Sequence, residues 1–198
     1  MHIEIDIPDG KSGVWSIETF TVEKNELSQV FSMFKTGRGV PEGTYKRLCR
    51  YGHVIMSNTP DEIRDFIRFV HKANGSILVN GLGLGVLLKA LLEKETITDI
   101  TVIEKEQDVI NLVAPYIKDD RVTIICANAF DYIPPKDKKY NYVWHDIWDN
   151  ICADNLKEMK TLHRKYGRKT EYQESWCRSQ CEYYERQDKK DSRYNKYY

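Results

Sequence analysis

The pattern of apolar and polar positions changes its period repeatedly in the middle of the chain. Short apolar runs alternate there with segments whose apolar residues recur every three or four positions. The runs are typical of buried strands, and the longer spacing is typical of amphipathic helices. The strands are expected within 77–79, 100–103, 122–126 and 142–144, and the helices at 86–92, 108–117 and 156–166. This alternation predicts right-handed βαβ units and a parallel sheet whose ligands lie at the carboxyl ends of its strands.

The segment before these units has a different pattern. Isoleucines alternate with acids over 3–7, and Pro-Asp-Gly at 8–10 predicts a turn into a second strand at 14–20, so we expect a β-hairpin. Leu27, Val30, Phe31 and Phe34 then have the spacing of one helical face, which Gly37 ends. The basic, glycine-punctuated segment 37–52 fits a mobile loop over a site and an ordinary solvated connection equally well.

A second helix is predicted, with Thr59 as its N-cap and Pro60 as its first helical residue. Glu62 is expected to complete a capping box with Thr59. Its apolar face comprises Ile63, Phe66, Ile67 and Val70, and Gly75 closes it.

The end of the chain carries a weaker pattern. After Gly167 no clear fifth to seventh strands are visible, and 172–187 is expected to form one aromatic helix before a polar tail. The predicted fold class is therefore α/β, a Rossmann-like, mostly parallel sheet flanked by helices, with an N-terminal β-hairpin and helical extension and a truncated C-terminal half. The expected parts are a substrate or lid region, a core, and an aromatic helix with its tail, at 1–75, 76–167 and 168–198.

Candidate chemistry begins with the segment Gly-Leu-Gly-Leu-Gly at 81–85, between the first core strand and its helix. Glycines allow positive φ and close approach of a ligand, and the helix that follows directs free N–H groups at the crevice. Glu104 follows the next strand, about twenty residues on, where a carboxylate can accept hydrogen bonds from a ribose diol. A dinucleotide fingerprint would need glycine at position 86, which is Val86. The pattern therefore predicts a nucleoside-containing ligand of another kind.

The glycine spacing resembles motif I of class I S-adenosylmethionine-dependent methyltransferases, and residues 76–149 look like the core of the spermidine-synthase-like branch of that fold. Val-Ile-Glu-Lys-Glu at 102–106 resembles the acidic motif II, and Ala-Asn-Ala-Phe-Asp-Tyr at 127–132 resembles the segment that touches the adenine. Residues 140–149 are similar to the fourth-strand segment that ends in two aspartates three apart.

The resemblance implies S-adenosylmethionine as the cofactor. The residues it assigns to cofactor binding are Asn80, Gly81, Gly83, Gly85, Glu104, Asn128, Ala129 and Asp146. Asn80 and Asn128 stand where the family carries acids, and their amide oxygens can still accept from an ammonium and from the adenine amino group.

The catalytic residues are expected to be Asp146 and Asp149. Asp146 can orient an acceptor or take its proton, and the alternative is that it caps the next helix. Asp149 fits a substrate cation and a cap of the next helix equally well, and Trp148 could pack a planar or cationic group. Trp144 and His145 are expected in the core. No metal site is expected, because adjacent strand residues point to opposite faces.

The composition of the chain limits the classes of partner that we expect. The chain has 30 basic and 30 acidic residues, so it lacks the basic footprint of a nucleic-acid binder. Five irregularly spaced cysteines fit a reducing compartment, and no apolar run approaches membrane-spanning length. We expect a cytoplasmic protein that acts on a small molecule without a membrane or nucleic-acid partner. The oligomeric state stays open.

Three functions remain compatible with these features. The first is a methyltransferase acting on a small molecule or exposed polar group. The second is an aminopropyltransferase, suggested by the pair Asp146 and Asp149. The third is a non-catalytic S-adenosylmethionine-binding or interaction protein, suggested by Asn80 and Asn128.

Overall fold

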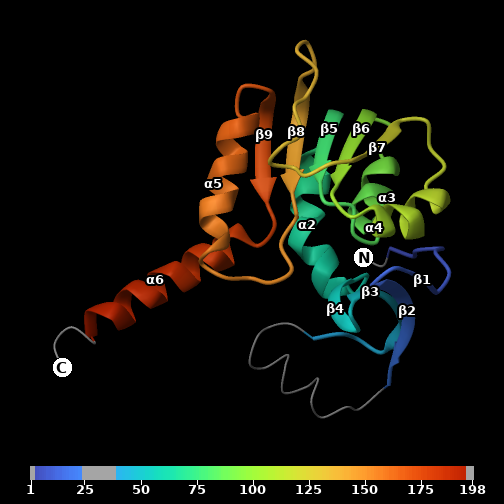
Figure 1. Ribbon diagram of the computed structural model, residues 1–198, viewed down its shortest axis with the longest axis horizontal. Coiled ribbons are helices and arrows are strands. Elements are labelled where there is room, and N and C mark those ends of the chain that lie inside the picture. The colour runs from blue at the N-terminus through green and yellow to red at the C-terminus, as the bar shows by residue number, and fades with distance from the viewer. Residues whose placement is uncertain (1–2, 24–38, 195–198) are drawn as a thin grey trace.

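The computed structural model describes residues 3–23 and 39–194, which form two sheets and the helices around them (Figure 1). The first sheet is antiparallel, in the order β1-β2-β3-β4, with bounds Gly10–Ser12, Trp15–Val22, Gly43–Arg50 and His53–Ser57. The second has five strands, β5 to β9, at Gly75–Asn80, Ile97–Glu104, Val122–Cys126, Tyr140–His145 and Thr170–Ser175. The helices are α2 (Pro60–Lys72), α3 (Val86–Leu92), α4 (Gln107–Val113), the 3-10 turn η1 (Ala114–Tyr116), α5 (Asn155–Tyr166) and α6 (Arg178–Tyr194).

The second sheet is parallel throughout, in the order β7-β6-β5-β8-β9. The chain runs outward from β5 to β7, and then returns to the other side of β5 with β8 and β9. Strand order therefore reverses at β5, and in such sheets ligands bind at the carboxyl ends of the strands beside the reversal. The antiparallel sheet lies beyond these ends (Figure 1).

Side-chain alternation divides the core into two layers. Ile77, Val79, Val102 and Trp144 pack in one cluster with apolar residues of α2, α3 and α4. Leu78, Ile103 and Val143 pack in the other with Met159, Leu162 and Tyr166 of α5. Helices thus cover both faces of the sheet, as expected for a Rossmann-like fold.

The strands and helices predicted for the middle of the chain are present, except that the helix predicted at 108–117 is α4 up to Val113 followed by the 3-10 turn η1. The helix at 86–92 and the strand at 122–126 have the predicted bounds, and α5 ends at Tyr166, before Gly167. Helix α2 begins at Pro60 as predicted, but the capping box is not formed. Glu62 instead accepts a hydrogen bond from the backbone N–H of Ser57, at 3.1 Å. The helix ends at Lys72, and Gly75 is the first residue of β5.

The N-terminal predictions need correction. Ile3, Ile5 and Ile7 are buried between exposed acids, yet 3–7 forms no strand, and the hairpin turns at Gly13 rather than at 8–10. The helix predicted at 27–34 lies outside the described residues. Half of the proposed loop 37–52 is strand β3, which pairs with β2 along eight residues. The segment 37–52 carries four basic residues and does not alternate regularly, although Tyr45, Leu48 and Cys49 within it are buried.

The C-terminal prediction was also wrong. Residues 170–175 form a fifth parallel strand, β9, beside β8, and the last helix begins only at Arg178. The sequence Thr-Glu-Tyr-Gln-Glu-Ser has no apolar run because this edge strand is only partly buried. Within 39–194 no sixth or seventh strand follows it. Helix α6 extends away from the body of the molecule (Figure 1).

No helix in the described part of the chain combines the length and apolar character needed to cross a membrane.

Candidate functional site

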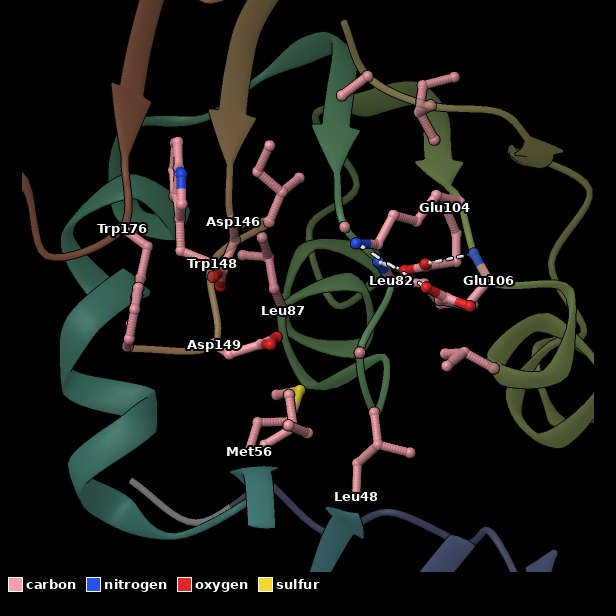
Figure 2. A pocket seen from close by; sticks show the side chains of 18 of the residues that line it. Leu48, Met56, Leu82, Leu87, Glu104, Glu106, Asp146, Trp148, Asp149 and Trp176 are labelled. Carbon is pink, nitrogen blue, oxygen red and sulfur yellow. Dashed lines mark hydrogen bonds and ion pairs between the residues drawn. The ribbon is translucent and has the colours of Figure 1, made fainter. Parts of the chain in front are cut away.

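A cavity of about 250 Å³ lies between the carboxyl ends of the parallel strands and the antiparallel sheet. The parallel-sheet unit contributes the glycine loop 81–83, residues 103–106, residues 127–130 and residues 146–149. The antiparallel sheet contributes Trp15, Leu48, Arg50, Ile55 and Met56. Figure 2 shows Glu104 and Glu106 on one side of this cavity, and Asp149, Trp148 and Trp176 on the other. The cavity thus lies at the reversal of strand order.

The carboxylate of Glu104 is held in place at the end of β6. One oxygen accepts from the backbone N–H of Leu82 and the other from that of Glu106, both at 2.9 Å (Figure 2). The residue is only 8% exposed and lines the cavity. Since each carboxylate oxygen has a further lone pair, the group can also accept from ligand hydroxyls. The Glu104 carboxylate is therefore fixed in orientation and can accept hydrogen bonds from a ligand in the cavity.

The glycine loop leaves less space for a ligand than the sequence predicts, because other groups of the protein lie against it. A β-carbon on Gly81, at φ +101°, would lie 1.9 Å from the carbonyl oxygen of Asp146. One on Gly83 would lie 2.1 Å from the sulfur of Met56. Gly85 caps α3 and does not line the cavity. Two of the three glycines thus accommodate the protein's own groups.

Met56 on β4 was not anticipated as a site residue. The backbone N–H of Leu84 lies 3.2 Å from its sulfur and donates to it. Figure 2 shows the side chain rising from β4 toward the cavity. No sequence signal links a methionine on the antiparallel sheet to the glycine loop, because the contact depends on how the two sheets pack.

The loop after β7 is fixed from the α5 side. The hydroxyl of Tyr166 donates to the carbonyl of Ala129 at 2.8 Å, and the ammonium of Lys165 donates to that of Phe130 at 2.5 Å. The side-chain oxygen of Asn128 accepts from the N–H of Phe130 at 2.9 Å. Asn128 and Ala129 both line the cavity. Hydrogen bonds from side chains to the backbone of this loop therefore fix this wall of the cavity.

Asn80 lies on the opposite side of the sheet from Glu104. Its side-chain nitrogen is 2.7 Å from Nδ1 of His145, and it does not line the cavity. The two-residue period of β5 directs it with Leu78 toward α5. The expectation that Asn80 faces the ligand is therefore corrected.

His145 is a core residue, as the sequence favoured. Burial lowers the pKa of its imidazole to about 3, and Nε2 lies 3.2 Å from the side-chain oxygen of Gln173. The neutral ring can donate to Gln173 and accept from Asn80, so it is satisfied without any ligand.

Asp146 follows the last residue of β8 and lines the cavity. The pKa of its carboxyl is raised to about 7, mainly by burial and to a smaller extent by the nearby charge of Asp65, while the indole N–H of Trp144 at 3.5 Å opposes the shift. The residue does not cap the next helix, because α5 begins at Asn155. A carboxyl that changes protonation state near neutral pH can exchange a proton with a ligand.

Two indoles line the cavity near Asp146, and a carboxylate orients each of them. Trp148 donates from Nε1 to Glu158 at 2.7 Å, and Trp176 donates to Asp65 at 3.1 Å. Sequence reasoning missed Trp176, since it had assigned that segment to a helix. The indoles give the cavity aromatic surface of the kind that packs against planar or cationic groups.

Asp149 forms an ion pair with Arg50 of β3 and lines the same cavity. It is therefore not a free anion, and it does not cap the next helix, because α5 begins at Asn155 with Asp154 at its N-cap. Over residues 3–23 and 39–194, no three His, Cys, Asp or Glu side chains are grouped to hold a metal ion.

Comparison with known proteins gives matches among solved structures only. No protein-family model matches the chain, and no curated protein matches it. Spermidine synthase from Thermotoga maritima is 17% identical with a TM-score of 0.46, covering 79% of this chain and 52% of that one. The plantazolicin methyltransferase BpumL in complex with SAH is 18% identical with a TM-score of 0.37, covering 52% and 39%. A dimethyladenosine transferase from Plasmodium falciparum is 18% identical with a TM-score of 0.37, covering 45% and 32%.

The chain spans about half the length of these structures or less. At such identities the likeness concerns the fold alone. The sheet itself defines the class of protein: an α/β protein with a doubly wound, Rossmann-like parallel sheet.

Proposed function

We propose that this protein is an S-adenosylmethionine-dependent methyltransferase that acts on a small molecule or an exposed polar group. One observation carries the proposal. Glu104, fixed by the N–H groups of Leu82 and Glu106, shares one cavity with Asp146, and the two follow the carboxyl ends of β6 and β8, the strands on either side of β5. A ribose-binding carboxylate and a proton acceptor beside it are the two groups that this chemistry needs.

Binding of the nucleoside would rest on two walls of the cavity. Glu104 would accept from the ribose hydroxyls with the lone pairs that Leu82 and Glu106 leave available. The loop 128–130, held by Lys165 and Tyr166, would lie along the base. The cofactor contributes an electrophilic methyl group on a sulfonium.

Asp146 would take up or orient the proton of the acceptor. Because its pKa is about 7, the carboxylate is available at neutral pH and still holds a proton well enough to remove one from an acceptor. Trp148 and Trp176 would position a planar or cationic acceptor by packing against it.

Aminopropyl transfer is the second candidate, and the charge of the cavity favours it. Carboxylates outnumber cations on the lining, with Glu62, Glu104, Glu106, Asp146, Asp149 and Glu158 against Arg50 and Lys105. An excess of negative charge attracts cationic ligands, including a decarboxylated cofactor and an amine. A spermidine synthase is also among the similar structures.

Titration calorimetry with S-adenosylmethionine, S-adenosylhomocysteine and decarboxylated S-adenosylmethionine tests the binding site. We expect at least one to bind, and we expect Glu104→Gln to weaken it about tenfold through loss of charge-assisted hydrogen bonds. Glu95→Ala, at an exposed position outside the cavity, is the control and should bind normally. Absence of binding to all three, or equal binding by Glu104→Gln, would contradict the proposal.

A further inference from the structure

We propose that the ion pair of Arg50 and Asp149 recognises the amino-acid head of the cofactor, with Arg50 binding its carboxylate and Asp149 its α-ammonium. The inference rests on the proposed function and deepens it, because it selects a cofactor that still carries its carboxylate.

The pair joins two separate parts of the molecule at the cavity. Arg50 is the last residue of β3 in the antiparallel sheet, and Asp149 lies in the loop between β8 and α5. Their side chains are 32% and 42% exposed, and both line the cavity. The pair is thus open to exchange with a ligand instead of being sealed in the core.

The guanidinium of Arg50 is also oriented from one side. Its central carbon lies 5.4 Å from the centre of the Trp15 ring, and Trp15 is buried. Aromatic faces attract guanidinium groups, and the planar fork of arginine matches a carboxylate through two parallel hydrogen bonds. The group is therefore presented to an anion with part of its freedom already lost.

The positive charge of Arg50 lies where the amino-acid head of the ligand is expected. The other cation on the described lining, Lys105, follows Glu104 directly and lies 3.8 Å from Glu106, on the ribose side. Arg50 instead contacts the loop that follows Asp146. A ligand whose ribose lies at Glu104 and whose sulfonium lies near Asp146 would bring its amino-acid head toward Arg50 and Asp149.

A zwitterion can replace this ion pair without leaving either charge unpaired. Its carboxylate takes the place of Asp149 on Arg50, and its ammonium takes the place of Arg50 on Asp149. A decarboxylated cofactor offers only the ammonium, so binding to Asp149 would leave Arg50 without its anion. Leaving one partner of a charged pair unmatched reduces affinity, so the pair discriminates between the two cofactors.

Arg50→Gln is the test, and the chain provides a matched control. Arg47 lies on the same strand, pairs with Glu18 at 2.8 Å and stands 5.5 Å from the Phe20 ring, but it does not line the cavity. Calorimetry would use S-adenosylhomocysteine, which has the amino-acid head, and 5′-methylthioadenosine, which lacks it. We expect Arg50→Gln to bind the first about tenfold more weakly and the second unchanged, and Arg47→Gln to match the wild type with both.

The outcomes separate this inference from the function on which it rests. If the wild type binds neither nucleoside, the proposed function fails. If it binds both and Arg50→Gln weakens neither, or weakens both equally, the assignment of Arg50 is overturned. Arg50→Lys keeps the charge without the fork and serves if Arg50→Gln does not fold, with an intermediate loss expected for S-adenosylhomocysteine alone. Asp149→Asn should likewise weaken only S-adenosylhomocysteine, and an unchanged affinity would refute its role.

Discussion

The carbonyl oxygen of Asp146 occupies the space beside Gly81 in which any larger residue would place its β-carbon. The separation would be 1.9 Å, and the N–H of Asp146 meanwhile donates to the carbonyl of Asn80 at 2.8 Å. The glycine loop and the end of β8 are therefore locked together through the backbone. Because Asp146 begins the segment that carries the proposed chemistry, this contact sets where that segment starts.

Substitution of Gly81 by alanine should destabilise the protein strongly. The new methyl group would collide with backbone, which cannot rotate away, and φ at this position is +101°. We expect a loss of roughly 3 kcal/mol in the free energy of unfolding, measured by urea denaturation. Gly52→Ala is the control, since φ there is +78° but no atom lies within 4 Å of the added carbon. It should cost about 1 kcal/mol, from backbone strain alone. Equal losses in the two variants would show that the close approach at Gly81 is unimportant.

Asp146→Asn should make the protein more stable at alkaline pH. The folded-state pKa of this carboxyl is about 7 against an ordinary value of 3.8, so the native state binds a proton more tightly than the unfolded chain. That contribution is fully present below pH 3.8 and is lost as the pH rises through 7. Asparagine carries no such penalty. At pH 8 we expect the variant to gain about 2 kcal/mol in urea denaturation, less than the full shift gives because the residue is partly exposed.

The same variant tests the proposed chemistry. Methyl or aminopropyl transfer should increase as the pH rises through about 7 in the wild type, because the ionised carboxylate is the proton acceptor. Asp146→Asn should retain nucleoside binding and lose this pH dependence together with about a hundredfold of its rate. Normal turnover by a variant that binds the nucleoside would remove Asp146 from the reaction.

The parallel strands with apolar runs could be predicted from sequence, and the edge strand β9 could not. The apolar runs at 77–79 and 100–103 identify β5 and β6 because both sides of these strands must be covered. Strand β9 is polar and only partly buried, so it has no comparable signal, whereas the other edge strand, β7, was predicted because it carries valine and two isoleucines. In β3, the basic residues that form ion pairs and cation–π contacts interrupt the alternation.

The residues of the candidate site that could be predicted are those at the carboxyl ends of the parallel strands. Glu104 and Asp146 follow from the rule that ligands gather at the carboxyl ends of a parallel sheet. Asn80 was assigned to the ligand by the resemblance, but the alternation along β5 places it with Leu78 on the α5 side, opposite His145 of β8. Arg50, Met56 and Trp176 come from elements distant in the chain, and only tertiary packing brings them to the cavity.

Met56→Ala should strengthen nucleoside binding. The thioether lies against Gly83 and accepts from the N–H of Leu84, so a ligand that uses this part of the loop must displace it. Removing the side chain abolishes that cost, and we expect S-adenosylhomocysteine to bind about threefold to tenfold more tightly in calorimetry. Met56→Leu keeps the volume without the sulfur and is the control, with an affinity near that of the wild type. Weaker binding by Met56→Ala would instead make Met56 part of the ligand contact.

Tyr166→Phe should loosen the loop that forms the base-side wall. The hydroxyl of Tyr166 donates to the carbonyl of Ala129 at 2.8 Å, and both residues are buried. Phenylalanine leaves this carbonyl without that donor, so we expect a loss of about 1 to 2 kcal/mol in the free energy of unfolding. Because the loop then samples more positions, 5′-methylthioadenosine should also bind a few times more weakly in calorimetry. Tyr183→Phe, at a position 52% exposed on α6, should change neither quantity. A loss of stability with unchanged nucleoside affinity would show that this anchor supports the fold alone, and that the base-side wall is fixed by Lys165 and Asn128 without it.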